Sequence, residues 1–415
     1  MTTEEGRRLP RFWCGIDWSE ALNDVAVVDE HDQMVAHTRV EATDEGVREI
    51  LALLRGLRSS HRHSRMQVPV AIETPHGLLV AALRAKGQPI VVINPSAVAR
   101  YRGRISPARK KSDRTDAVLL ANILRTDGGL HRAMPRTSEQ AAAIAVLARA
   151  QRRAVRTRRY QANQVRSLLR EYYPAALLAW KDLPDGIVRA EARALLALAP
   201  TPGQAAALSK RKIADTISGV GRSRLVDDHA ERLRSAFHQH HLRRPPLIEA
   251  AMGEQIRTAV GLLDQACTAV EQLTEATTDA FQAHPQARVY ASFPGCGPLI
   301  GARLLAEIGD DPDRFTVRGL RAYAGAAPLT WESSSSRVVT HRRIANSNLK
   351  AVGHIWAFTS LTRSPGCRAH YDRRREQGDR YAAALRNLYG RLLSSLHFCL
   401  KNATRYREEA AFPQR

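Results

Sequence analysis

Cysteine is scarce in this chain of 415 residues, and the few cysteines present are scattered. No CxxC pair and no Cys/His zinc spacing occurs, so neither a disulfide framework nor a structural zinc site is expected. We interpret the five cysteines as reduced, mostly buried thiols: Cys14, Cys267, Cys296, Cys367 and Cys399.

Long apolar runs are also missing. No stretch approaches the roughly twenty consecutive apolar residues that a membrane-spanning helix needs. The first residues, MTTEEGRRLPRF, do not contain the apolar core of a secretory signal. We therefore expect a cytoplasmic protein with no membrane partner.

Acidic side chains are outnumbered, with 41 Asp and Glu against 63 Lys and Arg, and the formal net charge is +22. A surplus of this size favours a polyanionic partner, above all nucleic acid, although cationic surfaces also bind membranes. The length is sufficient for two or three domains.

Glycine and proline are absent from residues 137–173, which predicts one long helix that ends before Pro174. From Arg149 to Arg170 this helix carries eight arginines with no acid between them. A basic helix is often simply solvated, but this row repels itself unless a polyanion lies nearby. The predicted nucleic-acid contacts are Arg152, Arg153, Arg156 and Arg159.

A second helical pattern over residues 247–284 predicts a partner for this helix. The two form either an antiparallel pair or a dimerising coiled coil, although the heptad register is imperfect. Between them, residues 185–246 are mixed, basic and short-helical, with Gly219 and Gly221 as a weak candidate phosphate contact. The pattern assigns no role to this insertion.

The amino-terminal part alternates between strand and helix patterns. Its predicted order is three strands, a helix, a strand, a helix, a strand and a final helix, which is the order of the ribonuclease H fold. Strands are expected at 11–19, 24–29, 34–41, 66–75 and 89–95, and helices at 43–57, 77–86 and from about Ser112.

Four acidic residues fall where that fold would bring carboxylates to one edge of a mixed sheet. Asp17 ends the first strand, Glu73 ends the fourth, and Asp113 and Asp116 lie three apart on the last helix, after the predicted N-cap Ser112. Gathered carboxylates repel one another and need cations. Hard divalent ions bound in this way perform phosphoryl transfer. Separately, each acid has a simpler explanation, as a turn residue or as a helix-start acid that complements the helix dipole.

A basic segment, residues 100–114, precedes the last two acids, and Gly103 and Pro107 are expected to keep it irregular. It is either a solvated loop or a segment that steers phosphates toward the acids. Its predicted nucleic-acid contacts are Arg102, Arg104, Arg109, Lys110 and Lys111.

The carboxyl-terminal part opens with FPGCGPLIGARLLAEIGD at residues 293–310. Gly295 and Gly297 precede a helix of small and aliphatic residues, as in a helix-hairpin-helix turn whose backbone N–H groups meet a phosphate. A purely structural helix cap is an equally good explanation. A small-residue helix, a run of four serines, a basic ribbon and another helix follow over residues 314–359.

Together, the motifs DWS, IETP, KSDRTDA, PGCGPLIGARLLAEIGD, AYAGAAPLTWES and HRRIANSNLK resemble the DEDD insertion-sequence transposases, also called bridge-RNA-guided serine recombinases. The resemblance covers nearly the whole chain and is specific because the motifs occur in combination. It implies that Asp17, Glu73, Asp113 and Asp116 bind two Mg²⁺ ions, for which Mn²⁺ can substitute.

The resemblance also implies a nucleophilic serine shortly after Ala327-Pro328, which matches Ser333. Family members usually have glycine after this serine, whereas here Ser334 follows, so Ser334 to Ser336 stay open as alternatives. Arg337, Arg342 and Arg343 are expected to hold DNA phosphates beside the serine. Attack by the serine would leave a 5′-phosphoserine and a free 3′ hydroxyl.

The implied architecture is α/β followed by all-α. It comprises a ribonuclease-H-like catalytic domain at 1–130, a helical or coiled-coil region at 137–285 that contains the insertion, a helical domain with the serine at 286–400, and a tail at 401–415. The implied partners are DNA of the element ends and target, a structured guide RNA and further copies of the chain as a dimer or tetramer. Two alternatives remain: a metal-dependent, junction-resolving nuclease that uses water, and an inactive nucleic-acid-binding relative.

Overall fold

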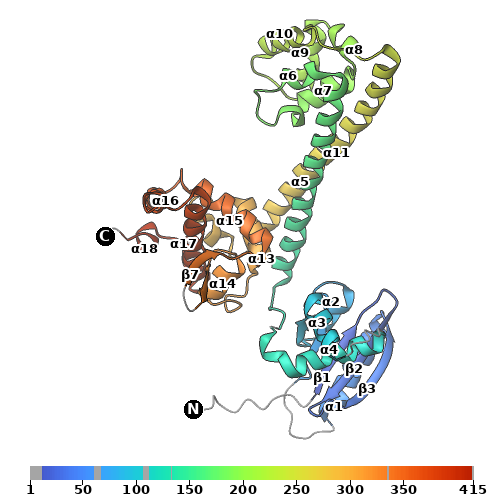
Figure 1. Cartoon of the computed structure of the whole chain (residues 1–415), viewed down its shortest axis with the longest axis vertical. Helices are drawn as coiled ribbons and strands as arrows, with labels where there is room; N and C mark the ends of the chain where they lie inside the picture. The colour runs from blue at the N-terminus through green and yellow to red at the C-terminus, as the bar shows by residue number, and fades with distance from the viewer. Residues whose placement is uncertain (1–11, 60–66, 106–111, 132, 334–335, 414–415) are drawn as a thin grey trace. The chain divides into compact units, whose positions relative to one another are not determined.

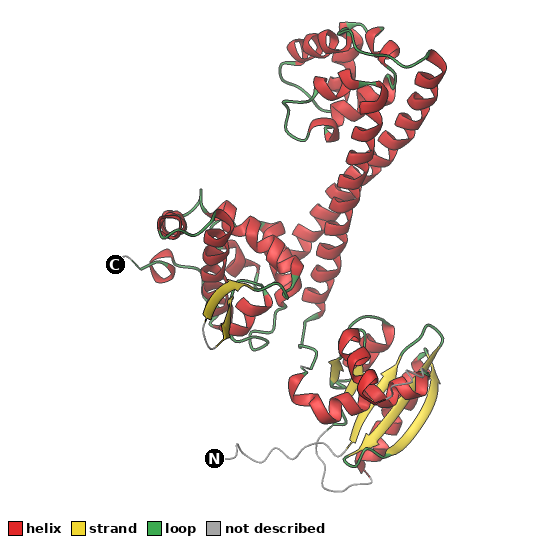
Figure 2. Cartoon of the chain, in the orientation of Figure 1, coloured by secondary structure: helices red, strands yellow, loops and turns green. Residues whose placement is uncertain are grey.

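The computed structural model describes residues 12–59, 67–105, 112–131, 133–333 and 336–413. It divides into two compact units, Met1–Pro135 and Arg136–Arg415 (Figure 1). The first unit contains a five-stranded sheet, and the second is almost entirely helical apart from one two-stranded sheet (Figure 2). The predicted α/β and all-α parts are therefore both present. Arg109, Lys110, Lys111, Ser334 and Ser335 lie outside the described residues.

The sheet of the first unit is mixed, in the order β3-β2-β1-β4-β5. The first three strands pair antiparallel, and β4 and β5 run parallel to β1. This arrangement follows from the connections, because short turns join β1, β2 and β3 whereas helices join the parallel strands. The strands are β1 (Phe12–Asp17), β2 (Leu22–Asp29), β3 (Met34–Glu41), β4 (Val70–Ile72) and β5 (Ile90–Val92).

Helices cover both faces of this sheet. On one face, α1 (Asp44–Ser59) and α2 (Leu78–Ala85) pack against a core that includes Ile16 and Ile72. The other face is covered by α3 and α4 (Asp113–Asp127), and its core includes Trp13, Ala71, Val98 and Leu120. The strand and helix order matches the expected order, except that α3 is an additional helix.

The additional helix, α3, spans Pro95–Ile105 and corrects the prediction that residues 100–105 are irregular. Proline is well suited to the first turn of a helix, where its missing N–H has no partner to lose. Val98 is 1% exposed and packs with α4, so tertiary packing outweighs the modest cost of Gly103 in the helix interior. The basic segment is therefore helical up to Ile105.

Two long helices form the centre of the second unit, α5 (Glu139–Tyr172) and α11 (Pro246–Gln282). They pair antiparallel within one chain, since Ile144 shares a core with Phe281 and Gln151 Nε2 donates to Thr274 Oγ1 at 2.9 Å. Of the two packings that the sequence left open, the structure shows the antiparallel pair.

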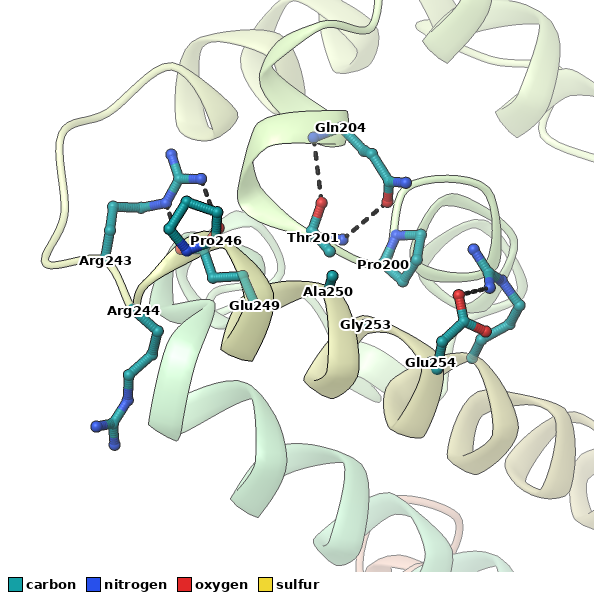
Figure 3. A pocket seen from close by; sticks show the side chains of 11 residues that line it. Pro200, Thr201, Gln204, Arg243, Arg244, Pro246, Glu249, Ala250, Gly253 and Glu254 are labelled. Atoms are coloured by element: carbon teal, nitrogen blue, oxygen red, sulfur yellow. Dashed lines mark hydrogen bonds and ion pairs between the residues drawn. The ribbon is translucent and has the colours of Figure 1, made fainter.

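A cluster of short helices lies at one end of this pair, and we call it the distal subdomain (residues 173–245). Its core is built around Phe237, whose ring contacts those of Tyr173 and Trp180. A pocket of about 410 Å³ opens between α8 and the start of α11 (Figure 3). The helices of the subdomain are α6 (Pro174–Ala179), α7 (Ala190–Leu198), α8 (Pro202–Ala206), α9 (Lys210–Gly219) and α10 (Val226–Phe237).

The remaining helices surround another core of the second unit at the other end of the pair, centred on Trp356, Tyr290 and Tyr389. One β-hairpin, made of β6 (Pro328–Ser333) and β7 (Ser336–His341), projects between α14 and α15. Across the described residues, no helix combines the length and apolarity needed to cross a membrane. The helices of this part are α12 (Ala287–Ala291), α13 (Pro298–Ile308), α14 (Val317–Tyr323), α15 (Ser347–Ser360), α16 (Pro365–Glu376), α17 (Tyr381–Lys401) and α18 (Glu408–Ala411).

Candidate active site

Two of the four predicted acids lie on neighbouring parallel strands. β1 and β4 pair in parallel up to Ile16 opposite Ile72. The next residue is Asp17 after Ile16 and Glu73 after Ile72. Both side chains are half-buried. Because side chains alternate along a strand, Asp17, the last residue of β1, follows Trp13 onto the face that α3 and α4 cover, and Glu73 is the first residue after β4. The sheet therefore brings Asp17 and Glu73 together at its carboxyl edge.

The helix with the other two acids packs on this same face. α4 crosses β1 so closely that a Cβ added to Gly15 would lie 2.0 Å from the carbonyl oxygen of Ala117. Glycine at position 15 therefore permits the helix to rest directly on the strand. Asp113 and Asp116 are in the first turn of α4; Asp113 lies one turn before Ala117, and Asp116 directly precedes it.

The start of α4 is fixed by its own sequence. Ser112 Oγ accepts a hydrogen bond from the Thr115 N–H, and the Thr115 hydroxyl accepts one from the Ser112 N–H. This reciprocal capping confirms Ser112 as the predicted N-cap. Asp113 is exposed, whereas Asp116 is 5% exposed.

Asp116 is paired with a cation from the neighbouring helix. Arg102 on α3 donates from Nε at 3.1 Å and from Nη2 at 2.7 Å to the same oxygen, Oδ1. Within the described part of the chain, no three Asp, Glu, His or Cys side chains are close enough to hold one metal ion. Asp113 and Asp116 thus lie on the helix that packs over β1, and among the described residues the acids do not form a compact metal-holding cluster.

Arg102 and Arg104 were predicted as nucleic-acid contacts. The structure pairs Arg102 with a predicted metal ligand, while Arg104 is exposed with its guanidinium 5.7 Å from the centre of the Tyr101 ring.

Asp24 is an acid at this edge that the sequence analysis missed. It pairs directly with Asp17 across β1 and β2, is 2% exposed, and accepts bonds from His37 Nε2 at 2.9 Å and Arg39 Nε at 3.0 Å. These bonds compensate its burial, so Asp24 serves as a structural neighbour of the candidate ligands. An antiparallel alignment of the first two predicted strands across the turn that joins them would have placed Asp24 opposite Asp17.

Cys14 lies on the same strand but contributes no ligand. Its thiol is fully buried on the opposite face of the sheet, and burial raises its pKa to about 12. Since a thiol binds metal only as the thiolate, it stays out of the chemistry. All five cysteines are free and buried.

The predicted nucleophile lies at the end of a β-hairpin in the second unit. Ser333 is the last residue of β6 and pairs with Ser336, the first residue of β7. Arg337 follows on β7, opposite Glu332. Beyond the hairpin, Arg342 is half-buried and Arg343 is exposed.

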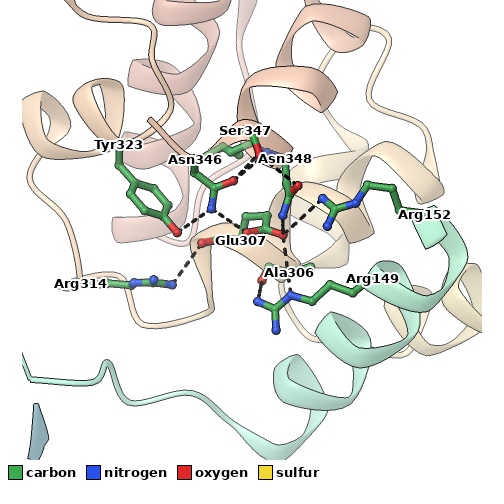
Figure 4. A network of polar contacts seen from close by, with 10 residues as sticks. Arg149, Arg152, Ala306, Glu307, Arg314, Tyr323, Asn346, Ser347 and Asn348 are labelled. Atoms are coloured by element: carbon green, nitrogen blue, oxygen red, sulfur yellow. Dashed lines mark hydrogen bonds and ion pairs between the residues drawn. The ribbon is translucent and has the colours of Figure 1, made fainter. Parts of the chain in front are cut away.

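A buried carboxylate anchors the segment that follows this hairpin (Figure 4). Glu307 on α13 is 7% exposed and accepts from Asn346 Nδ2 at 2.7 Å and from Asn348 Nδ2 at 3.0 Å. Asn346 also caps α15, where its Oδ1 accepts from the N–H groups of Asn348 and Leu349. Glu307 therefore ties α13 to the start of α15 and so to the base of the hairpin.

The same carboxylate serves the arginine row of α5. Glu307 Oε1 lies 3.8 Å from Arg149 Nε and 3.9 Å from Arg152 Nη1. The row is thus partly compensated by α13, which spacing along α5 could not reveal. The other predicted contacts, Arg153, Arg156 and Arg159, are exposed.

The predicted phosphate turn is occupied by protein contacts. A Cβ on Gly295, which has φ of +69°, would lie 2.7 Å from the Ser360 backbone nitrogen, so only glycine fits there. Trp356 Nε1 donates to the Pro294 carbonyl at 3.1 Å, and Thr359 Oγ1 donates to the Gly295 carbonyl at 3.0 Å. Gly297 is the N-cap of α13. These contacts explain Gly295 by packing against α15.

The distal pocket of Figure 3 contains arginines, but most of them have acidic partners. Arg243 donates to both carboxylate oxygens of Glu249, at 2.5 and 2.6 Å, and Arg257 pairs with Glu254. Arg244 Nε donates to the Glu171 carbonyl at 3.2 Å. The pocket therefore offers little uncompensated charge for a phosphate.

Comparison with known proteins identifies the family. Residues 14–174 match the "Transposase" family model of the IS110 DEDD type, and residues 287–372 match "Transposase IS116/IS110/IS902 family". The mini-circle transposase assigned to IS117 of Streptomyces coelicolor is 48% identical over 401 residues, 96% of each chain. The chain belongs to the IS110 family of DEDD insertion-sequence transposases.

More distant relatives agree with this assignment. An IS110 protein of Streptomyces coelicolor is 29% identical over 75% of this transposase and 76% of its own length. An IS900 protein of Mycobacterium paratuberculosis is 26% identical over 95% of this chain and 96% of its own. The first matched region contains all four predicted acids, and the second contains Ser333 and the turn at Gly295. The transposase is therefore an enzyme of DNA transposition, of a family type that depends on divalent metal.

Proposed function

We propose that this transposase cuts and rejoins DNA at the ends of its element through the hydroxyl of Ser333, assisted by divalent cations at the acidic sheet edge. The proposal is supported mainly by the register of β1 and β4, which ends one residue before Asp17 and Glu73, together with the packing of α4 over Gly15.

The donor set fits magnesium. Asp17, Glu73, Asp113 and Asp116 offer only carboxylate oxygens, which hard cations prefer. Asp113 is exposed, and Asp116 becomes available once Arg102 exchanges away. We propose two Mg²⁺ ions, with Mn²⁺ as a substitute. When bound by these carboxylates, two such ions would lower the pKa of an oxygen nucleophile and stabilise a leaving oxygen.

The transfer itself exchanges one ester bond for another. Ser333 Oγ forms a bond to phosphorus, its proton passes to solvent, and the bond from phosphorus to the 3′ oxygen breaks. The 3′ oxygen takes up a proton and leaves as a hydroxyl. The 5′-phosphoserine keeps the ester, so the 3′ hydroxyl of another strand can displace the serine. Arg337, Arg342 and Arg343 follow the serine and neutralise phosphate charge.

A structured guide RNA from the element's own ends is the partner we propose for target choice. In such an arrangement base pairing reads sequence, while the protein reads backbone and shape. The exposed Arg153, Arg156 and Arg159 on α5 suit a nucleic-acid backbone of either kind.

The test is to trap the covalent intermediate. The protein, coexpressed with the noncoding DNA that flanks its gene, is incubated with a duplex that carries the element junction and Mg²⁺. We expect a protein–DNA adduct whose modified peptide contains Ser333. Ribonuclease treatment of the complex before the reaction should prevent formation of this adduct. Ser333→Ala should abolish the adduct and strand exchange, and Asp17→Ala should abolish both as well.

Three results would redirect the proposal. An adduct that maps to Ser334 would move the nucleophile by one residue. Cleavage that persists in Ser333→Ala but fails in Asp17→Ala would identify a nuclease that uses water. Binding without cleavage in the unaltered protein would identify an inactive relative.

A further inference from the structure

A second concave feature adjoins the acidic edge on the other face of the sheet. Trp18 and Thr74, which directly follow Asp17 and Glu73, line a pocket of about 280 Å³. Ile72 also lines it, on the sheet face that α1 and α2 cover. Two residues of the pocket lining are therefore the immediate chain neighbours of candidate metal ligands.

The walls of this pocket are largely apolar and include one flat aromatic ring. Val47, Leu79 and Val80 line it from α1 and α2. Trp18 is 46% exposed although it is large and apolar. The volume of the pocket is close to the lower end of the range for small-molecule sites, about 300–1,000 Å³. A single planar ring is an occupant of suitable size.

The charge of the lining argues against a phosphate as the occupant. Among the described residues, no lysine or arginine lines the pocket, although the chain contains 63 of them, and His76 is the one basic side chain in its lining. Glu20 and Asp44 do line it, and both are exposed. Carboxylates repel phosphate but accept hydrogen bonds from exocyclic amino groups of bases. The lining thus favours a neutral ring that bears an amino group.

A buried amide supplies the complementary donor. Asn23 lines the pocket, is 1% exposed, and its Oδ1 accepts from the Ser19 N–H at 3.4 Å. Its Nδ2 has no hydrogen-bond partner among the described residues. A buried donor without a partner costs about 1–3 kcal/mol, so a ring nitrogen or carbonyl that reaches it would bind favourably.

We propose that this pocket holds one unpaired nucleobase with an amino group, adenine or cytosine, drawn out of the stack beside the phosphate that is cut. The proposal rests on the proposed function for the identity of that phosphate. Trp18 stacks on the base, Glu20 or Asp44 accepts from its amino group, and Asn23 donates to a ring acceptor. Removing the neighbouring base from its stack also opens the backbone to the acids.

The test measures how much of the binding depends on the base. Fluorescein-labelled single strands of 12 abasic deoxynucleotides, with adenine, cytosine, thymine or no base at the centre, are titrated with the full chain in EDTA. Fluorescence anisotropy gives the dissociation constants. We expect adenine and cytosine strands to bind about 5- to 100-fold more tightly than the base-free strand, the range for one stacked base, and more tightly than thymine.

Variants assign this preference to the pocket. Trp18→Ala should abolish the preference for adenine and cytosine while changing the dissociation constant of the base-free strand by no more than about twofold. Trp18→Phe should retain most of the preference. Asn23→Leu should keep stacking but reduce the difference between cytosine and thymine. The matched control is Phe398→Ala, an aromatic residue of similar exposure in the other unit, which should change neither.

Results that contradict the base pocket can be distinguished from results that contradict the proposed enzyme activity. Equal weakening of all strands by Trp18→Ala, or an unchanged preference, overturns the pocket even if a Ser333 adduct forms. A preference that Trp18→Ala removes supports the pocket even if no adduct ever forms. Ribose strands with the same base test the source: tighter binding of deoxyribose supports a base of the cut DNA, and tighter binding of ribose overturns the placement beside the cut phosphate in favour of a guide RNA.

Discussion

The Asp116 carboxylate illustrates how a single side chain can depend on its partner. With 5% exposure it must be neutralised, and in the described residues its partner is Arg102. A cation that replaces the guanidinium would satisfy the same oxygen. The Arg102 guanidinium therefore lies where a bound metal cation would neutralise the Asp116 carboxylate.

Arg102→Gln should strengthen metal binding and lower the thermal stability of the metal-free protein. Loss of a charge-assisted bond of about 1.5–3 kcal/mol leaves Asp116 free for a cation, so we expect Mn²⁺ affinity to rise by about tenfold. The midpoint of thermal unfolding should fall without metal and recover with it. Calorimetric titration and thermal melts provide the measurements.

The control for that variant is Arg100→Gln, an exposed arginine of the same helix whose Nε bonds to the Ser96 carbonyl. It should leave both quantities unchanged. Equal Mn²⁺ affinity in Arg102→Gln and the unaltered protein would show that the guanidinium does not compete with metal.

Gly15→Ala should separate α4 from β1. The added methyl would lie 2.0 Å from the Ala117 carbonyl, which must move with its helix. We expect destabilisation by about 1–3 kcal/mol, the usual cost of overpacking, measured by urea unfolding. Gly103→Ala is the matched control, since nothing lies within 4 Å of that position and alanine favours its helix. An unchanged unfolding midpoint in Gly15→Ala would contradict the close packing.

At the scale of elements, the hairpin that carries Ser333 depends on contacts outside itself. A two-stranded hairpin is marginal in water. Here Asn346, five residues after β7, is held by Glu307 and also donates to the Tyr323 hydroxyl at 2.7 Å. The base of the hairpin is consequently joined to α13, α14 and α15.

Glu307→Ala should loosen this base. It removes one acceptor from two asparagines and leaves Arg152 without its acid, so we expect a loss of about 2–4 kcal/mol in stability. Hydrogen exchange should accelerate in β6 and β7 more than in α17. Glu275→Ala, an exposed acid on α11, is the control and should change neither. Uniform acceleration across the unit would instead indicate general destabilisation.

At the scale of the whole molecule, the acids and the serine belong to different compact units. The acids lie in Met1–Pro135 and Ser333 in Arg136–Arg415. The proposed mechanism uses both groups, so it predicts that the two units are brought together, within one chain or between copies.

Complementation tests this division. Asp17→Ala and Ser333→Ala should each be inactive alone, whereas a mixture should recover part of the strand exchange if one copy supplies acids and another supplies the serine. Recombination of the element junction, scored by amplification of the product, is the measurement. A double variant mixed with unaltered protein is the control. No recovery, with both variants folded, would place the complete site within one chain.

Sequence patterns predicted much of the fold because they report local physics. Alternation of apolar residues located β1 to β3, the absence of glycine and proline located α5, and Ser112 marked the start of α4. Local patterns failed at α3, where packing of Val98 against α4 outweighs Gly103. The ribonuclease H assignment and the role of Ser333 stay predictions.

The amino-acid sequence by itself determined the family and the element order, since these depend on spacing and chain composition, and it predicted which carboxylates gather. Only the tertiary structure decided that Arg102 neutralises Asp116, that Glu307 serves both α5 and the hairpin base, and that Asp24 faces Asp17. These pairs join residues far apart along the chain. Burial determines which of them must be compensated, and burial exists only after the elements pack.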